Sequence, residues 1–226
     1  MTDFKIALGL LLTLAGLASG CRNAPLVADI PIGPSYVPSN FHQLAPSFGS
    51  RVKKVLVLPL KPGNAQDNMR EGVSVLESVM IAEVMKTGRF EVIVGDRERL
   101  NQMLRMQAFS AEDRLPQDFL QKVRDEFGCD AVMFSVLTHY RPYPPLAVGW
   151  KLRLVDAVDG QTWWTVDEVF DATDDRVAVG ARKFQEKNMK YNGAIPVLQD
   201  TFTVLLVPRQ FGMYTVRAVV ETMPVR

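Results

Sequence analysis

Thiol and imidazole groups, which do much of protein chemistry, are scarce in this chain. It has two cysteines, Cys21 and Cys129, and two histidines, His42 and His139. A metal centre needs several such ligands close together, so we expect no metal site, and we expect no cofactor. Cys129 stands at the start of an apolar run, and its local sequence lacks the features that stabilise a thiolate. We therefore predict that Cys129 is buried and unreactive.

Cys21 has a different chemistry because of the residues before it. An apolar run from residue 4 to residue 17, with Lys5 as its one cation at the start, leads through Ala-Ser-Gly to Cys21. These are the parts of a secretory signal, and the run is shorter than the ~20 apolar residues that cross a bilayer. The stretch resembles a bacterial lipobox, which implies cleavage before Cys21 and a diacylglycerol on its sulfur. Leu is commoner than Ala at the place of Ala18, and an ordinary cleaved signal with an incidental cysteine is the alternative.

Acidic residues occur where turns explain them. Asp156 and Asp159 flank a hairpin whose Asp159-Gly160 pair lies between two strand-like runs, and we assign both carboxylates to turn formation. The sequence contains no nucleophile elbow, P-loop or dinucleotide-binding glycine motif. We therefore expect no enzymatic activity, although converging acids around Asp156, Asp159 and Asp167 would revive that hypothesis. His139 is expected on the surface, or else at a partner contact.

Aromatic residues around one rigid loop suggest a protein-binding face. Tyr140 and Tyr143 lie at the Arg-Pro-Tyr-Pro-Pro stretch, and Trp163 begins a strand. Trp163 and Trp164 are adjacent in that strand, so we expect them on opposite faces, with one in the core. We take Tyr140, Tyr143 and Trp163 as candidate partner-binding residues, because aromatic side chains are enriched at binding hot spots. Burial of Trp163 beneath a helix is the alternative.

Charge and length restrict the partners. The 226 residues contain 26 Lys and Arg against 25 Asp and Glu, a formal net charge of +1. No strongly basic face for nucleic acid is indicated. Removal of residues 1–20 as a signal peptide leaves 206 residues, enough for one sizeable core or two small domains. Residues 21–50 are rich in proline and lack periodicity, so we predict an extended tether that hangs free or wraps along a neighbouring subunit through Phe41 and Leu44.

Residues 51–226 show the alternating elements of an α/β domain. Continuous apolar runs predict strands, and apolar residues at helical spacing predict helices. Both a helix and a strand are possible after Pro208, because of Gly212 and several β-branched residues. The fold class is therefore α/β, with a mixed sheet and helices packed over it. The expected strands are 51–60, 90–94, 131–138, 148–157 and 161–170, and the expected helices begin near residues 68, 96, 116, 173 and 208.

Several stretches in order resemble one family of bacterial envelope proteins. Together they are similar to the periplasmic domain of the curli-secretion-channel (CsgG-like) family, which also includes the lipoprotein of Pel exopolysaccharide export and a lipoprotein activator of a penicillin-binding protein. The resemblance covers roughly residues 51–170 and the lipobox. The stretches are Val55-Leu56-Val57-Leu58-Pro59, Gly88-Arg89-Phe90-Glu91-Val92-Ile93, Asp96-Arg97, Leu100, Gly128-Cys129-Asp130-Ala131-Val132 and Leu152 to Gly160.

This resemblance implies a sandwich like that of anticodon-binding domains and a place on the periplasmic side of the outer membrane. The resemblance implies no catalytic residues. Curli channels insert two amphipathic hairpins per subunit, and we find no spare pair of such hairpins in this sequence. Two functions stay open: a lipid-anchored protein that binds a partner in envelope assembly, and a ring-forming component of an export machine.

Overall fold

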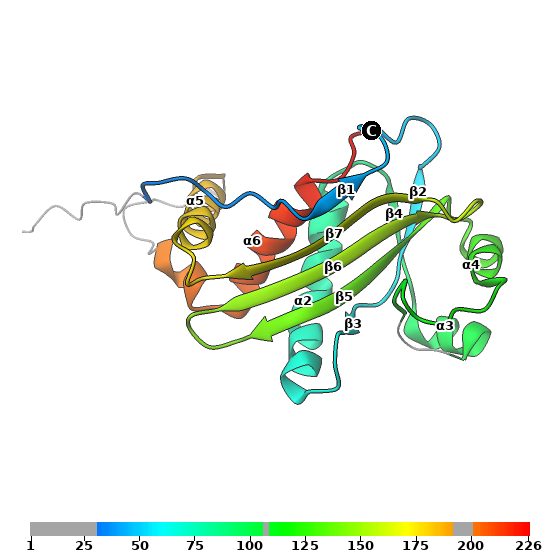
Figure 1. Ribbon diagram of the computed structural model, residues 1–226, viewed down its shortest axis with the longest axis horizontal. Helices are drawn as coiled ribbons and strands as arrows, with labels where there is room; N and C mark the ends of the chain where they lie inside the picture. Colours follow the sequence, from blue (N-terminus) through cyan, green and yellow to red (C-terminus); the bar gives the residue numbers. More distant parts are fainter. Residues whose placement is uncertain (1–30, 106–108, 192–200) are drawn as a thin grey trace, which may run out of the picture.

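The computed structural model describes residues 31–105, 109–191 and 201–226, so the predicted signal peptide and Cys21 lie outside the described residues. Within them, seven strands form one mixed sheet with helices packed over it (Figure 1), which confirms the predicted class. The likeness to anticodon-binding domains stays a prediction. The elements are β1 (Phe41–Gln43), β2 (Lys54–Val57), β3 (Lys61–Pro62), α2 (Asp67–Lys86), β4 (Glu91–Val94), α3 (Arg97–Leu104), α4 (Phe119–Phe127), β5 (Ala131–Arg141), β6 (Ala147–Asp156), β7 (Thr162–Asp171), α5 (Asp175–Tyr191), the 3-10 helix η2 (Thr201–Leu205) and α6 (Pro208–Glu221).

The order of the strands is β1-β7-β6-β5-β2-β4, with β3 beside the far half of β5. Strands β5, β6 and β7 form an antiparallel meander, while β2 runs parallel to both β4 and β5. In such sheets, ligands bind outside the carboxyl ends of neighbouring parallel strands. Here the chain leaves β2 and continues along β5 as β3, where Lys61 pairs with Val136. The position beside β5 is therefore taken by the protein's own backbone.

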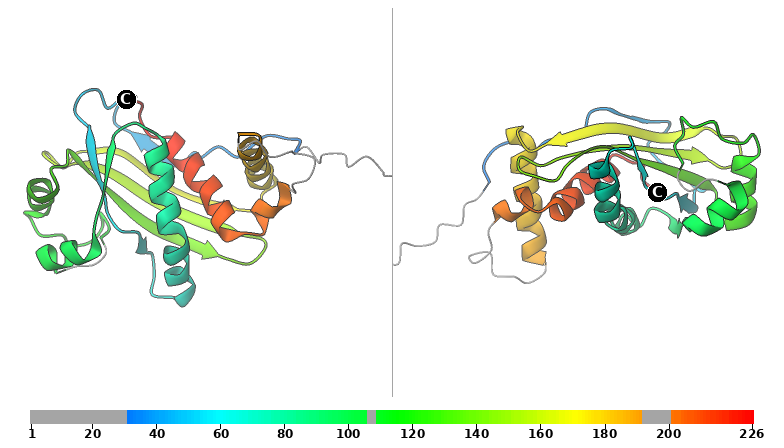
Figure 2. Two further views of the ribbon diagram at one scale, coloured as in Figure 1. Left: turned by 180° about the vertical axis from the view of Figure 1, so that it is seen from behind. Right: turned by 90° about the horizontal axis from the view of Figure 1, so that it is seen from below.

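One face of the sheet carries the larger core. Trp150, Leu152 and Leu154 alternate along β6 and are buried under the layer of α2, α5 and α6 (Figure 2). The indole Nε1 of Trp150 donates to Thr215 Oγ1 of α6 at 2.9 Å, so its polar atom is satisfied in the core. Each large apolar side chain buried in this way contributes about 1.5–3 kcal/mol.

The segment after Pro208 is a helix, which resolves the alternative that the sequence left open. Helix α6 lies against α2, and Figure 2 shows the two side by side on the same face of the sheet. A Cβ atom on Gly212 would lie 2.3 Å from Leu76 Cδ2. The glycine that made a strand plausible is thus the residue that lets α6 approach α2.

A smaller core lies on the opposite face of β2 and β5. Leu56 and Val132 point to this side and pack with Phe119 and Val123 of α4 and with residues of α3. Cys129 is buried here, as predicted, and burial raises the pKa of its thiol to about 11. The thiol is therefore protonated and unreactive at neutral pH.

Residues 31–50, which we call the strap, correct the prediction of a free tether. Strand β1 of the strap pairs with β7, and Phe48 is buried with ring contacts to Phe90 and Trp163 at 6.0 Å. The buried carboxylate of Glu168 accepts hydrogen bonds from Tyr36 Oη and from two strap backbone amides. Proline excludes helix from this segment, but an extended backbone suits a sheet edge as well as it suits a tether.

Two local predictions also need correction. The helix expected near residue 68 has Gln66 as its N-cap and begins at Asp67, while the Asn68 amide donates to Tyr140 O. An Asp-Gly pair between strands is typical of a tight turn with positive φ at both residues, but only Gly160 has it, at 73°. The loop is longer because Asp156 folds back and accepts from Val158 N, which confirms its assignment to turn formation.

Candidate interaction surface

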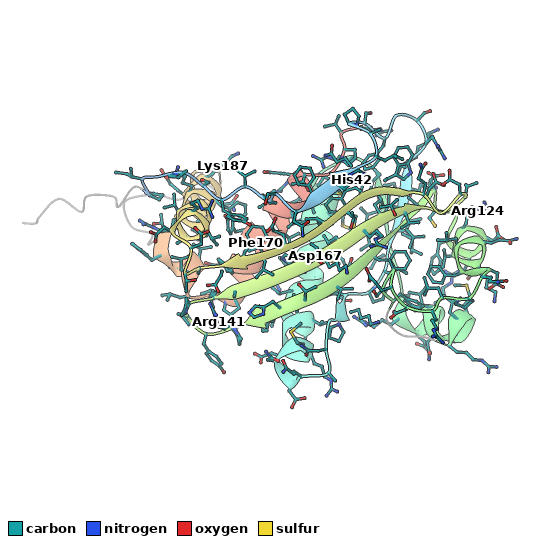
Figure 3. The ribbon with its side chains drawn as sticks, viewed as in Figure 1. His42, Arg124, Arg141, Asp167, Phe170 and Lys187 are labelled. Carbon is teal, nitrogen blue, oxygen red and sulfur yellow. The ribbon has the colours of Figure 1, made fainter. Side chains whose placement is uncertain are left out.

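Away from the end where Phe119 of α4 packs on Phe134 of β5, no helix of the described chain covers one face of the β5–β6–β7 meander, and we call this surface the open face (Figure 1). Register assigns its residues, because directly paired positions of antiparallel strands share a face. Val136 pairs with Lys151, which pairs with Asp167, and Arg153 pairs with Thr165 in the same way. Figure 3 labels Asp167 on this meander. The open face consists of His42, Val136, His139, Gly149, Lys151, Arg153, Thr165, Asp167 and Val169.

A network of charges crosses the open face. Glu112, from the connector before α4, lies 3.0 Å from Lys151 Nζ and 3.3 Å from Arg153 Nη2, and Lys151 Nζ lies 3.8 Å from Asp167. Burial alone would raise the pKa of Glu112. Hydrogen bonds from Ser110 and Lys151, with the charges of Lys151 and Arg153, outweigh it and lower this pKa to about 2. Glu112 is therefore ionised throughout the physiological range and holds two cations in place.

A pocket of about 260 Å³ adjoins this network. Its lining includes Lys61, Glu112, Thr138 and Lys151, and Lys61 Nζ is paired with Asp113 at 2.5 Å. Thr138 is the extra residue of a β-bulge opposite β6, and its buried Oγ1 has no hydrogen-bond partner among the described residues. The pocket offers paired charges and a hydroxyl rather than a nucleophile next to a base.

The structure does not bring the three candidate partner-binding residues together. Tyr140 lies near the end of β5 and Trp163 near the start of β7, which runs in the same direction, so the two occupy opposite ends of the sheet. Both are buried, which contradicts their assignment to an exposed face. Tyr143 is 75% exposed. Of the three, it alone has the accessibility that a partner contact requires.

The burial of Trp163 has a local cause. Leu154 pairs with Trp164 and Val155 with Thr162, so Trp163 is the extra residue of a bulge. The bulge breaks the alternation, and both tryptophans enter the same core instead of pointing to opposite faces. Trp163 Nε1 donates to Asp156 Oδ2 at 3.2 Å, while Arg51 lies over its ring.

The loop that carries Tyr143 is held firmly at its base. Arg141 donates through Nε to Pro145 O and forms an ion pair with Asp171 at 2.7 Å. These contacts tie residues 141–145 to the end of β7, and Figure 3 labels Arg141 at this position. An exposed tyrosine on a fixed loop binds with little loss of conformational entropy.

The charges of the open face were not predicted, although the sequence holds a signal for them. Trp150, Leu152 and Leu154 alternate with Lys151 and Arg153. Lys151 and Arg153 must point away from the core that their neighbours enter. Glu112 had no such signal, because a connector places it over β6 only in the folded chain. His139 is exposed, as predicted.

In the described ranges, no three His, Cys, Asp or Glu side chains are grouped closely enough to hold a metal ion. No helix in those same ranges has the length and hydropathy to cross a bilayer. Asp156 and Asp159 share Arg51, at 3.0 Å from each, whereas Asp167 contacts Lys151. The three acids do not form one converging cluster.

Comparisons with known proteins give structural matches only. Neither a family model nor a curated protein sequence matches this chain. The lipoprotein GNA1162 from Neisseria meningitidis is 20% identical over 52% of this chain and 79% of its own, with a TM-score of 0.38. PelC from Paraburkholderia phytofirmans, solved as a dodecamer, is 12% identical over 82% and 97%, with a TM-score of 0.45. The C-terminal domain of LpoB from Escherichia coli is 16% identical over 54% and 86%, with a TM-score of 0.35. Likenesses this distant assign no function, and the resemblance to curli channels stays a prediction.

Proposed function

We propose that this chain is a lipid-anchored protein of the bacterial envelope whose domain binds a protein partner through the open face, without catalysis. The observation that carries the proposal is a three-strand surface that no described helix covers beyond its α4 end, on which charged residues are held in fixed positions. Covered sheet faces bury apolar residues, whereas this face presents a patterned set of charges. Membrane attachment comes from the lipobox at Cys21, and we place the domain at the periplasmic face of the outer membrane.

The anchor is tested by metabolic labelling with palmitate. The wild-type protein should take up label and fractionate with the outer membrane, and Cys21→Ala should lose the label. Equal labelling of the two proteins would contradict the anchor. Loss of label without a change in fractionation would show that another part of the protein holds it at the membrane.

The partner surface is tested by cross-linking in membranes. A photoreactive residue at Thr165, in the middle of the open face, should give a discrete adduct with another protein. The same probe at Lys122 of α4 is the control, since its exposed side chain lies outside the open face. Reversal of charge in Arg153→Glu should reduce the adduct from Thr165, because charge pairs across an interface set specificity. Equal adducts from Thr165 and Lys122 would contradict the assignment.

A ring built from copies of this chain is the alternative. The observation that favours it is a pair of open sheet edges. Among the described strands, β1 pairs with β7 alone and β4 with β2 alone. Phe41 and Leu44 are exposed next to the first edge, and Val94 is exposed on the second. Two different edges that meet in a heterologous contact generate a closed ring or a filament.

Sedimentation of the processed chain distinguishes the two proposals. A single monomer at high concentration would contradict the ring. If a larger species forms, Val94→Lys should dissociate it, because a lysine on an edge strand opposes edge pairing. Val158→Lys is the matched control, since that valine is exposed in the β6–β7 loop, away from both edges.

A further inference from the structure

The described chain begins at one end of the molecule, beside α5. Gly33 O accepts a hydrogen bond from Lys183 Nζ at 2.6 Å, and Tyr36 N donates to Arg176 O at 2.9 Å. Figure 1 shows the start of the strap next to α5, with α3 and α4 at the far end of the sheet. Nine residues, 22–30, separate Cys21 from the strap. At about 3.3 Å each they reach about 30 Å, so this end of the domain stays near Cys21.

Apolar side chains are exposed at this end. Ile32 is 89% exposed and Val37 is 74% exposed, which places both among the most exposed large apolar residues of the described chain. Phe48, further along the same strap, is buried in the core. The strap therefore anchors itself through its later residues, and no described residue covers its first apolar side chains.

The charge of α5 complements this apolar surface. The helix contains five Lys and Arg against two Asp and Glu, a net charge of +3, in a chain whose formal net charge is +1. Arg176, Lys183 and Lys187 share one side of it, since seven and four residues correspond to nearly whole turns. Asp174 neutralises Arg176 at 2.7 Å, which leaves the two lysines as the main positive charges. Lys187 is exposed and is labelled at this end in Figure 3.

We propose that this surface, the α5 end, lies on the membrane that holds the lipid anchor. Its residues are Ile32, Val37, Arg176, Lys183 and Lys187. Ile32 and Val37 enter the headgroup region, and the lysines contact anionic phospholipid headgroups. The inference rests on the proposed lipid anchor. It has the consequence that the sheet projects from the bilayer with α3 and α4 furthest away, so that the open face is accessible from the side.

Depth-dependent fluorescence quenching tests this orientation. The lipidated full chain carries a fluorophore on Lys187→Cys or Ile32→Cys, in vesicles of phosphatidylcholine and phosphatidylglycerol that contain a nitroxide headgroup lipid. Labelling is specific because Cys129 is buried and Cys21 is acylated. Val158→Cys is the matched control, since Val158 is 70% exposed in a loop near α4, at the other end. Strong quenching at 32 and 187 with little at 158 is expected, and equal or stronger quenching at 158 would overturn the proposal.

A second measurement isolates the contribution of charge. The processed chain without acyl groups begins at Cys21 and contains every described residue. Its partitioning onto the same vesicles should fall about fivefold in Lys187→Gln, the factor that one cation near an anionic surface contributes. Lys122→Gln, on α4 at the far end, should change nothing. Loss of binding at high salt is expected, because screening shortens the reach of surface charges. Identical partitioning of the two variants would contradict the role of α5.

Failure of the anchor and failure of the orientation give different results. If palmitate labelling shows no acyl chain on Cys21, the proposed function fails, and the vesicle measurement on the unacylated chain still decides the α5 end. If the unacylated chain does not bind the vesicles, the proposed orientation is overturned. Concentration-dependent self-association that protects label 187 without lipid quenching would also overturn it, in favour of a contact between subunits.

Discussion

On β6, Trp150, Leu152 and Leu154 face the layer of α2, α5 and α6, whereas Lys151 and Arg153 between them face solvent. Both faces extend across the same three strands, β5, β6 and β7, so the two faces differ in chemistry rather than in extent. One face is apolar and covered, and the other is charged, with no described helix over it beyond the α4 end. Burial of the first face stabilises the fold, and the charges of the second contribute little because water screens them. Substitutions on the second face are therefore expected to cost little stability.

The largest effect should come from a core deletion on the covered face. Leu152→Ala removes a fully buried side chain and should reduce the free energy of unfolding by about 3 kcal/mol, measured by urea denaturation. Arg153→Ala, the next residue along the strand, should cost less than about 1 kcal/mol. Similar losses from the two variants would mean that the open face also carries the stability of the fold.

A buried ion pair between α2 and α6 should give the next largest effect. Glu83 is almost fully buried, with Arg217 Nε 2.9 Å from its Oε2 and Lys86 Nζ 2.5 Å from its Oε1. Glu83→Gln leaves Arg217 without its counter-charge and should destabilise the protein by about 2 kcal/mol. Glu91→Gln, which removes the exposed pair with Lys54, should change stability by less than about 0.5 kcal/mol. A neutral result for Glu83→Gln would show that the helix layer does not need this charge.

The charge network of the open face should give a smaller, pH-dependent effect. The pKa of Glu112 is lowered from 4.5 to about 2, so its ionised form is favoured by folding. The stabilisation is present above pH 4.5 and is lost as the pH falls towards about 2. Because Glu112 is partly exposed, we expect less than about 1 kcal/mol. The difference in unfolding free energy between wild type and Glu112→Gln should shrink over that pH range, and a constant difference would exclude Glu112 as its source.

The smallest effect on stability is expected from Tyr143. Its side chain is exposed on the loop held by Arg141, so Tyr143→Ala should change the unfolding free energy by less than about 0.5 kcal/mol. Tyr140→Ala, which removes a buried ring from the same segment, should cost about 3 kcal/mol or more. If Tyr143 contacts a partner, its substitution should weaken the cross-linked complex from the open face while thermal unfolding stays unchanged.

Much of the fold follows from local sequence patterns. The strands and helices are close to the predicted ranges because apolar periodicity reports which side of an element meets a core. The burial of Cys129 and the turn role of Asp156 were also predictable, since each depends on residues within a few positions. The site was predicted less well, and only Tyr143 of the three proposed partner residues is exposed.

The remaining features depend on contacts between distant segments. A single extra residue in β7 turns Trp163 into the core, and no alternation rule can locate such a bulge. The strap lies along β7 because Glu168 of β7 accepts a hydrogen bond from Ser39 N, and because Phe48 of the strap packs on Trp163. Both contacts join residues far apart in the chain. Sequence alone determined the elements, their inner faces and the candidate anchor at Cys21. Tertiary structure decided which face the described helices leave uncovered and at which end of the domain the strap begins, because both depend on how helices and strap pack over one sheet.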